Sequence, residues 1–230
     1  MFELNKDLEI KEDSLLGSKI YTVDNFYKDP EEVSDYLFNR EVPLWKMEKR
    51  PSYNSVYFDD RRFIQTDFRL YDAYKFLSDL CGRSYDLPLI VTNVTRFSNN
   101  DFNDYENCFW WPHIDNGYNG IVYFNKDEEN SGTNLYDPKV LHDSEWKSKD
   151  LAPEHYLCWR PKEKYSVLKT FKSKYNSLCF FDGSKFPHGM NITNDRFFRD
   201  IPLFSYPQVG WDNYRCNQVF FLDEFHFLNP

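Results

Sequence analysis

The amino-acid sequence predicts an α+β protein that is mainly β, with N-terminal helices packed on one sheet of a sandwich or jelly roll (a double-stranded β-helix). Two observations predict this class. Helix signals lie before about residue 88, whereas the chain from Pro88 onward consists of short runs rich in Val, Ile, Thr and aromatic residues. Asn-Gly, Asp-Gly, Ser-Gly and Pro signals separate these runs, and no helix pattern lies between them, which is typical of two-sheet folds.

Two helices are predicted before the strands. Asp29-Pro30-Glu31-Glu32 has an N-cap, a first-turn proline and acids at the positive end of the helix dipole, so a helix is expected from there to about Asn39. A second helix is expected from Thr66-Asp67 to Gly82. Its apolar residues recur every three or four positions and are Phe68, Tyr71, Tyr74, Leu77 and Cys81. Each apolar face needs a partner surface.

The candidate strands are short and rich in β-branched and aromatic residues. They are expected at 89–98, 108–115, 120–125, 133–136, 165–170, 177–182, 187–192 and 197–206. Residues 139–164 are charged and contain Pro153 and Pro161, so this segment is interpreted as an excursion from the barrel.

The sequence predicts a single domain over residues 1–230. It comprises a helical lead-in (1–88), a jelly-roll core (89–206) and a C-terminal extension (207–230), with no repeat or low-complexity linker between them. The apolar run at 219–222 is interpreted as a last strand, a lid or a subunit contact.

Charge and cysteine content restrict the partners. The net charge of −9 argues against a nucleic-acid partner, because phosphate neutralisation needs a basic surface. No run is long and apolar enough for a bilayer, so no membrane partner is expected. The five cysteines are odd in number and form no Cys-x-x-Cys pair, which favours a reduced, cytoplasmic protein over a disulfide framework or a zinc knuckle.

His113-Ile114-Asp115 is the first motif with chemical potential. Residues two apart on a strand point to the same side, so this spacing places an imidazole and a carboxylate on one face. Chance alone supplies a His-x-Asp in many chains of this composition, so the motif needs support from its surroundings.

That support comes from the order of several segments around the motif. Together they resemble the iron(II)/2-oxoglutarate-dependent oxygenases, specifically the prolyl-4-hydroxylase-like branch, over about residues 89–206. The segments that carry the resemblance are 20–30 (IYTVDNFYKDP), 109–117 (FWWPHIDNG), 120–125 (GIVYFN), 131–136 (SGTNLY) and 177–189 (SLCFFDGSKFPHG).

The resemblance implies a metal site formed by His113, Asp115 and His188. Two imidazoles and one carboxylate on a rigid barrel form a facial triad, which leaves coordination positions open for a cosubstrate and dioxygen. A structural zinc site would instead use four ligands, commonly thiolates. The three ligands are each expected on a strand.

The resemblance also requires a cation for the far carboxylate of 2-oxoglutarate, because an unpaired buried anion is costly. If 193–195 forms a three-residue hairpin loop, Arg196 faces inward. If the loop is only Asn194-Asp195, Arg199 faces inward instead. Tyr123 matches a tyrosine that helps to hold the same carboxylate in this branch.

Three aromatic residues are candidates for the substrate pocket. By strand parity, Phe109 and Trp111 share the face of His113, with ordinary core packing as the alternative role. Phe97 stands where relatives often carry Tyr, so one hydrogen bond of the family is absent here. Pro112 lacks an N–H, which indicates that its strand is an edge or begins there.

The predicted function is therefore that of a 2-oxoglutarate-dependent dioxygenase (a hydroxylase) with Fe(II) and 2-oxoglutarate, and with ascorbate as reductant. Its expected substrate is a protein or peptide side chain, with proline the nearest precedent, or a free amino acid. Two alternatives remain: a non-catalytic jelly-roll binding or assembly module, and a cupin-like metal enzyme without 2-oxoglutarate.

Overall fold

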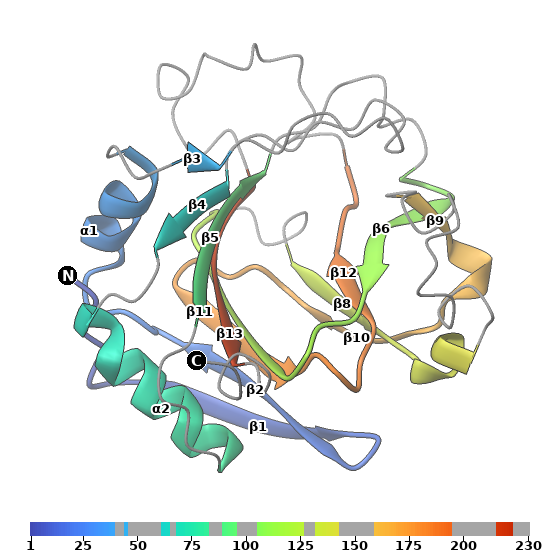
Figure 1. Cartoon of the computed structure of the whole chain (residues 1–230), viewed down its shortest axis with the longest axis horizontal. Coiled ribbons are helices and arrows are strands. Elements are labelled where there is room, and N and C mark those ends of the chain that lie inside the picture. The colour runs from blue at the N-terminus through green and yellow to red at the C-terminus, as the bar shows by residue number, and fades with distance from the viewer. Residues whose placement is uncertain are drawn as a thin grey trace, which may run out of the picture.

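The computed structural model describes residues 1–39, 44–45, 61–64, 68–82, 89–95, 105–126, 132–142, 159–194 and 215–222. In this part of the chain, two antiparallel sheets face each other and helices cover the outer side of the larger sheet (Figure 1). The prediction of a mainly β fold with two α-helices is confirmed.

The larger sheet has eight strands among the described residues, all paired antiparallel. In spatial order they are β1 (Glu9–Leu15), β2 (Ser18–Asp24), β11 (Ser177–Asp182), β7 (Tyr118–Tyr123), β13 (Arg215–Leu222), β5 (Leu89–Thr95), β4 (Arg61–Ile64) and β3 (Leu44–Trp45). Strands far apart in the sequence are therefore neighbours at the centre of this sheet.

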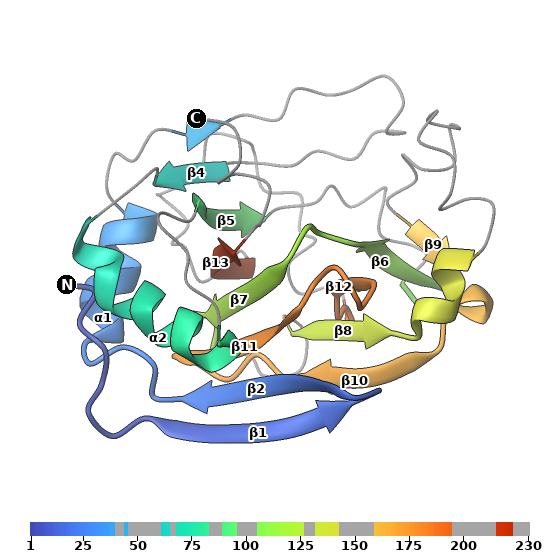
Figure 2. The same cartoon turned by 60° about the horizontal axis from the view of Figure 1, so that its bottom comes forward.

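The smaller sheet has five described strands and carries His113 and His188. Its spatial order is β10 (Val167–Phe171), β8 (Thr133–Tyr136), β12 (His188–Met190), β6 (Cys108–His113) and β9 (Trp159–Pro161). Two short 3-10 helices, η4 (Pro138–His142) and η6 (Lys162–Lys164), flank it (Figure 2).

The N-terminal cap predicted for the first helix and the C-terminal glycine predicted for the second are confirmed, but the second helix begins at Tyr71 and not near Thr66-Asp67. The Asp29 carboxylate accepts the N–H of Glu32 at 2.9 Å and so caps α1 (Pro30–Ser34), which continues as the π-helix η1 (Asp35–Asn39). The 3-10 turn η2 (Phe68–Leu70) leads into α2 (Tyr71–Cys81). That helix ends at Gly82, whose φ of 67° is the left-handed conformation that glycine adopts without strain.

The helices bury apolar side chains against the outer face of the larger sheet, as expected. Leu37, Phe38 and Leu77 are fully buried there with Phe124 and Phe180. The predicted apolar face of α2 is wrong in part, because Phe68 and Tyr71 are 87% and 68% exposed. Leu77 is buried as predicted, and Leu70 and Ala73 are buried with it. A small Ala and two Leu allow closer helix–sheet contact than a stripe of rings.

Truncation of this contact should be costly. Leu77→Ala is expected to lower the free energy of unfolding by about 2–5 kcal/mol, because it removes a fully buried side chain and leaves a cavity. Tyr71→Ala on the same helix is the matched control and should change stability by about 0.5 kcal/mol or less. Urea unfolding of both variants tests this, and equal losses would contradict the observed orientation of α2.

A second cluster lies between the two sheets. Strand β7 alternates across the larger sheet: Ile121 and Tyr123 point to the interior, and Val122 and Phe124 point to the helices. Burial on both sides makes the strand almost continuously apolar. The interior face of β7 is the one that leads to the candidate site.

Several predicted boundaries need correction. The lead-in is not only helical, because β1 to β4 lie within it; polar, exposed β1 has no apolar alternation to reveal it. The apolar run at 219–222 belongs to β13, a central strand between β7 and β5, so residues 215–222 are part of the core rather than of an extension. The excursion at 139–164 includes β9 residues. The predicted strand at 197–206 lies outside the described residues.

Candidate metal centre

The pairing of β6 with β12 brings the two histidines together. His113 is the last residue of β6 and His188 the first of β12, and they are direct cross-strand partners. Asp115 lies two residues beyond the end of β6, so it is on a loop and not on a strand as predicted. Its backbone N–H donates to the carbonyl of Gly183 at 3.1 Å, which ties this loop to the turn before β12.

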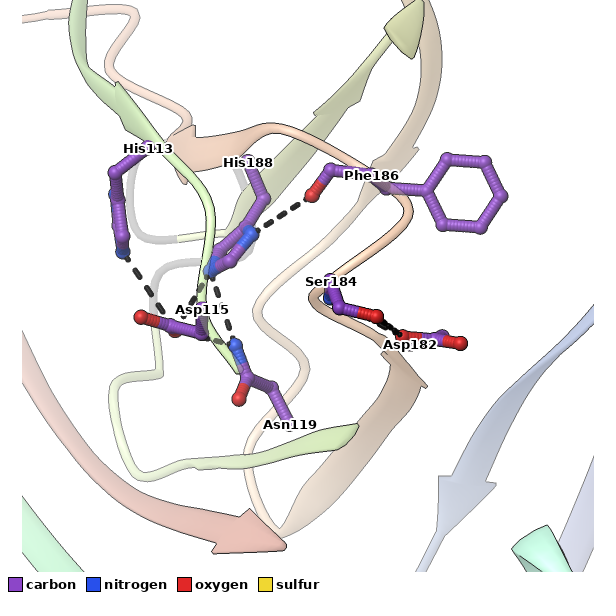
Figure 3. A network of polar contacts seen from close by, with 7 residues as sticks. All are labelled: His113, Asp115, Asn119, Asp182, Ser184, Phe186 and His188. Carbon is purple, nitrogen blue, oxygen red and sulfur yellow. Dashed lines mark hydrogen bonds and ion pairs between the residues drawn. The ribbon is translucent and has the colours of Figure 1, made fainter. Parts of the chain in front are cut away.

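The three side chains converge on one point (Figure 3). Asp115 Oδ2 lies 3.2 Å from His188 Nε2 and 3.8 Å from His113 Nε2, and one ligand atom from each residue lies within 4.8 Å of the others. His188 is almost fully buried, with a side-chain exposure of 4%, whereas the His113 side chain is 43% exposed. The cluster is therefore closed on the His188 side and open on the His113 side.

The backbone orients the ring of His188. Its Nδ1 lies 3.0 Å from the carbonyl oxygen of Phe186, which can only accept a hydrogen bond. Nδ1 therefore donates to this carbonyl, and Nε2 faces Asp115 Oδ2 at 3.2 Å. A carbonyl partner of this kind orients metal-binding histidines. The ring of Phe181 packs edge-on against the imidazole, with centroids 5.0 Å apart, and limits its rotation.

Asp115 is an anion at neutral pH. Burial raises the pKa of this carboxyl group, but the hydrogen bond from His188 and the nearby His113 and His188 imidazoles together hold the pKa well below its ordinary value. A carboxylate and two imidazoles suit a first-row divalent ion that keeps open positions. The cysteines that the structure describes contribute no ligand to this cluster.

Tyr123 lies in a buried polar group between the sheets. Its hydroxyl donates to Thr133 Oγ1 at 2.7 Å and lies 3.1 Å from Cys179 Sγ. Burial raises the pKa of Tyr123 well above its ordinary value, and the charge of Arg215 partly opposes this rise. A cation therefore lies close enough to influence the phenol.

That cation, Arg215, was missed by the sequence analysis. It is 7% exposed on β13, shares the interior face with Val219, and donates from a guanidinium nitrogen to the carbonyl of Gly132 at 3.4 Å. Its place at 215, in the segment interpreted as an extension, concealed it. The signal that could have found it is a basic residue a few positions before the apolar run 219–222.

Burial also makes Cys179 unreactive. It raises the pKa of this thiol to about 12, so at pH 8 only about one molecule in ten thousand carries the thiolate. Iodoacetamide should therefore modify the partly exposed Cys81 and Cys108 well before Cys179 in the folded protein. Mass spectrometry of peptides after a timed reaction measures this order, and Cys179 modification as fast as that of Cys108 would contradict it.

The structure places Phe109 on the opposite face of β6 from the one predicted. Its ring packs on Tyr136 and Tyr165, with centroids 4.9 and 6.3 Å away, on the side of the sheet opposite Leu135. The cause is a β-bulge: His188 pairs with His113, but Met190 pairs with Trp110, three residues further back. The bulge reverses the parity, so Trp110 shares the face of His113.

Pro112 lies within this bulge, and β6 is not an edge strand as predicted, because it lies between β12 and β9. Strand β9 pairs only with residues 108–110 of β6. Pro112, which has no N–H, therefore interrupts no backbone hydrogen bond between β6 and β9.

The remaining predicted site residues lie outside the described part of the chain. Arg196, Arg199 and Phe97 belong to this group, and of Trp111 only the backbone, as part of β6, is described. The structure therefore does not choose between Arg196 and Arg199.

No known protein family has a model that matches this chain, and no curated protein matches it. Within the described residues, every helix is too short or too polar to cross a membrane. The fold and site thus define a two-sheet β protein with a His-Asp-His cluster capable of holding a metal ion.

Proposed function

We propose that this protein is a non-haem iron(II)/2-oxoglutarate-dependent dioxygenase that hydroxylates a protein or peptide side chain or a free amino acid. The observation that carries the proposal is the convergence of His113, Asp115 and His188 within 4.8 Å. The two facing sheets are assigned, as part of the same proposal, to a double-stranded β-helix. The motif order that resembles the prolyl-4-hydroxylase-like branch supports both assignments.

The residues fit an iron(II) ion by their chemistry. His188 presents Nε2 to the cluster, Asp115 supplies the negative charge, and both are held by backbone contacts to the turn before β12. Iron(II), with 2-oxoglutarate, supplies the oxidising power for hydroxylation when bound. The protein's own part would be to hold the ion with three side chains and to leave the exposed His113 side of the cluster accessible to substrate.

Arg215 and Tyr123 are proposed to hold the far carboxylate of 2-oxoglutarate. The guanidinium is buried, lies on the interior face of β13 and influences the phenol of Tyr123 electrostatically. A carboxylate taken into this interior needs such a partner, because a buried unpaired anion costs several kcal/mol. Arg196 and Arg199 remain alternative candidates for the same role.

The proposal is tested by measuring succinate formation from 2-oxoglutarate with iron(II) and ascorbate. The expected result is succinate release that requires iron(II). Slow turnover without substrate is sufficient, so the substrate need not be known. Metal binding without cosubstrate turnover would replace the proposal by a cupin-like metal enzyme. Absence of any metal affinity would leave a jelly-roll binding or assembly module.

A further inference from the structure

Asn119 lies against the metal cluster without belonging to it. It is 2% exposed on the interior face of β7, the face shared with Ile121 and Tyr123. Its amide nitrogen lies 2.6 Å from Asp115 Oδ2 and 3.0 Å from His188 Nε2 (Figure 3). A single side chain thus contacts two of the three candidate ligands.

The chemistry of both partners shows which end of the amide faces them. The Asn119 amide NH₂ donates to Asp115 Oδ2, a carboxylate oxygen that accepts. The same nitrogen lies 3.0 Å from His188 Nε2, so the nitrogen of the amide and not its oxygen faces both candidate ligands. The donor end of Asn119 therefore occupies the position between two candidate ligand atoms.

Gly183 allows the amide to lie there. A Cβ at this position would lie 2.7 Å from Asn119 Nδ2, closer than real Cβ contacts, and 3.0 Å from its Cγ and 3.1 Å from the carbonyl oxygen of Gly117, which are tight. The φ of Gly183 is outside the left-handed region, so the requirement for glycine is one of space and not of backbone conformation. Any side chain at 183 would displace the amide.

We infer that Asn119 is a positioning residue for the metal centre, and that Gly183 holds its amide in register. Its N–H restrains Asp115 Oδ2, and the same nitrogen lies beside His188 Nε2. Asn119 would thus set the orientation of the carboxylate that a bound ion meets. This inference rests on the proposed metal centre.

Two substitutions at Asn119 separate positioning from packing. Asn119→Ala removes the donor and should weaken Mn(II) binding about 10–100-fold, the usual cost of losing a partner of a metal ligand. Asn119→Asp keeps the size and adds a negative charge beside the cation, so it should bind Mn(II) at least as tightly as the wild type. Titration of the full chain with Mn(II), followed by electron paramagnetic resonance, measures both. Equal weakening by both variants would overturn the inference in favour of a packing role.

Gly183→Ala tests the same amide from a second position. Its methyl group should displace Asn119 and weaken Mn(II) binding in the same direction as Asn119→Ala. In an Asn119→Ala background the added methyl should have a smaller further effect, because the two closest atoms that it meets are absent and only the Gly117 carbonyl oxygen, at 3.1 Å, remains. Gly120→Ala is the control: its Cβ lies on the other face of β7, at 3.4 Å from side chains of Leu77, Leu178 and Phe180, and should leave Mn(II) binding unchanged.

A readout without metal tests the contact itself. With ¹⁵N-labelled histidine, the His188 Nε2 resonance should shift in Asn119→Ala much more than the resonances of His113.

Wild-type protein that does not bind Mn(II) would overturn the proposed function and the inference together. Wild-type binding that Asn119→Ala and Gly183→Ala leave unchanged would overturn the inference alone.

Discussion

Asp115→Ala is expected to lower the affinity for divalent metal ions by at least about 100-fold and to abolish succinate formation. The substitution removes the negative charge of the cluster and leaves two imidazoles, of which His113 is on the open side. Loss of a direct ligand should exceed the 10–100-fold typical for loss of a residue that only orients one. Calorimetric titration with Mn(II) and the succinate assay measure the two effects.

Asp79→Ala provides the matched control for this substitution. Asp79 is an exposed aspartate on α2 that pairs with Lys75 at 2.8 Å, far in sequence from the cluster and outside it. It should leave Mn(II) binding and succinate formation unchanged, since surface pairs contribute little. Mn(II) binding by Asp115→Ala equal to that of Asp79→Ala would show that the cluster is not the metal site.

Arg215→Met should raise the concentration of 2-oxoglutarate needed for half-maximal turnover by about 100-fold. Methionine keeps a long side chain in the interior but removes the charge, so the far carboxylate would be buried without its partner. Such a loss costs about 2–5 kcal/mol, and each 1.4 kcal/mol corresponds to a tenfold change. The metal affinity should not change, because Arg215 is not among the ligands.

The control for this variant is Arg69→Met. Arg69 is an arginine at the surface, where it donates to Tyr36 Oη at 2.8 Å, and its loss should not alter the cosubstrate dependence. Circular dichroism establishes that Arg215→Met is folded before the assay. An unchanged 2-oxoglutarate dependence in a folded Arg215→Met would exclude Arg215, and the same substitution at Arg196 and Arg199 would then identify the cation.

Elements with local signals could be predicted from the sequence. The cap at Asp29 marks the start of the first helix, and the αL glycine at 82 marks the end of the second, because both signals act within a few residues. The strands at 133–136 and 177–182 were predicted with the bounds that the structure has, because turn signals and apolar runs mark them. Polar β1 and the short β3, β4 and β9 offer no such pattern.

The site was predictable in its members but not in its geometry. The spacing of His113 and Asp115 and the distant His188 could be read directly, and the structure brings them together. The face on which Phe109 lies could not be predicted, because a bulge in β6 reverses the side-chain alternation and the predicted alternation assumed a regular strand. Asn119 and Gly183 meet only because the turn before β12 packs on β7.

The amino-acid sequence by itself thus determined the local elements and the residues able to bind a metal, since capping, turn chemistry and periodicity act over a few neighbouring positions. Only the tertiary structure decided which distant side chains share one point. The pairing of β6 with β12 joins positions 113 and 188, and the insertion of β13 beside β7 brings Arg215 near Tyr123. Strand pairing depends on burial across the whole core, so no short segment of the chain specifies it.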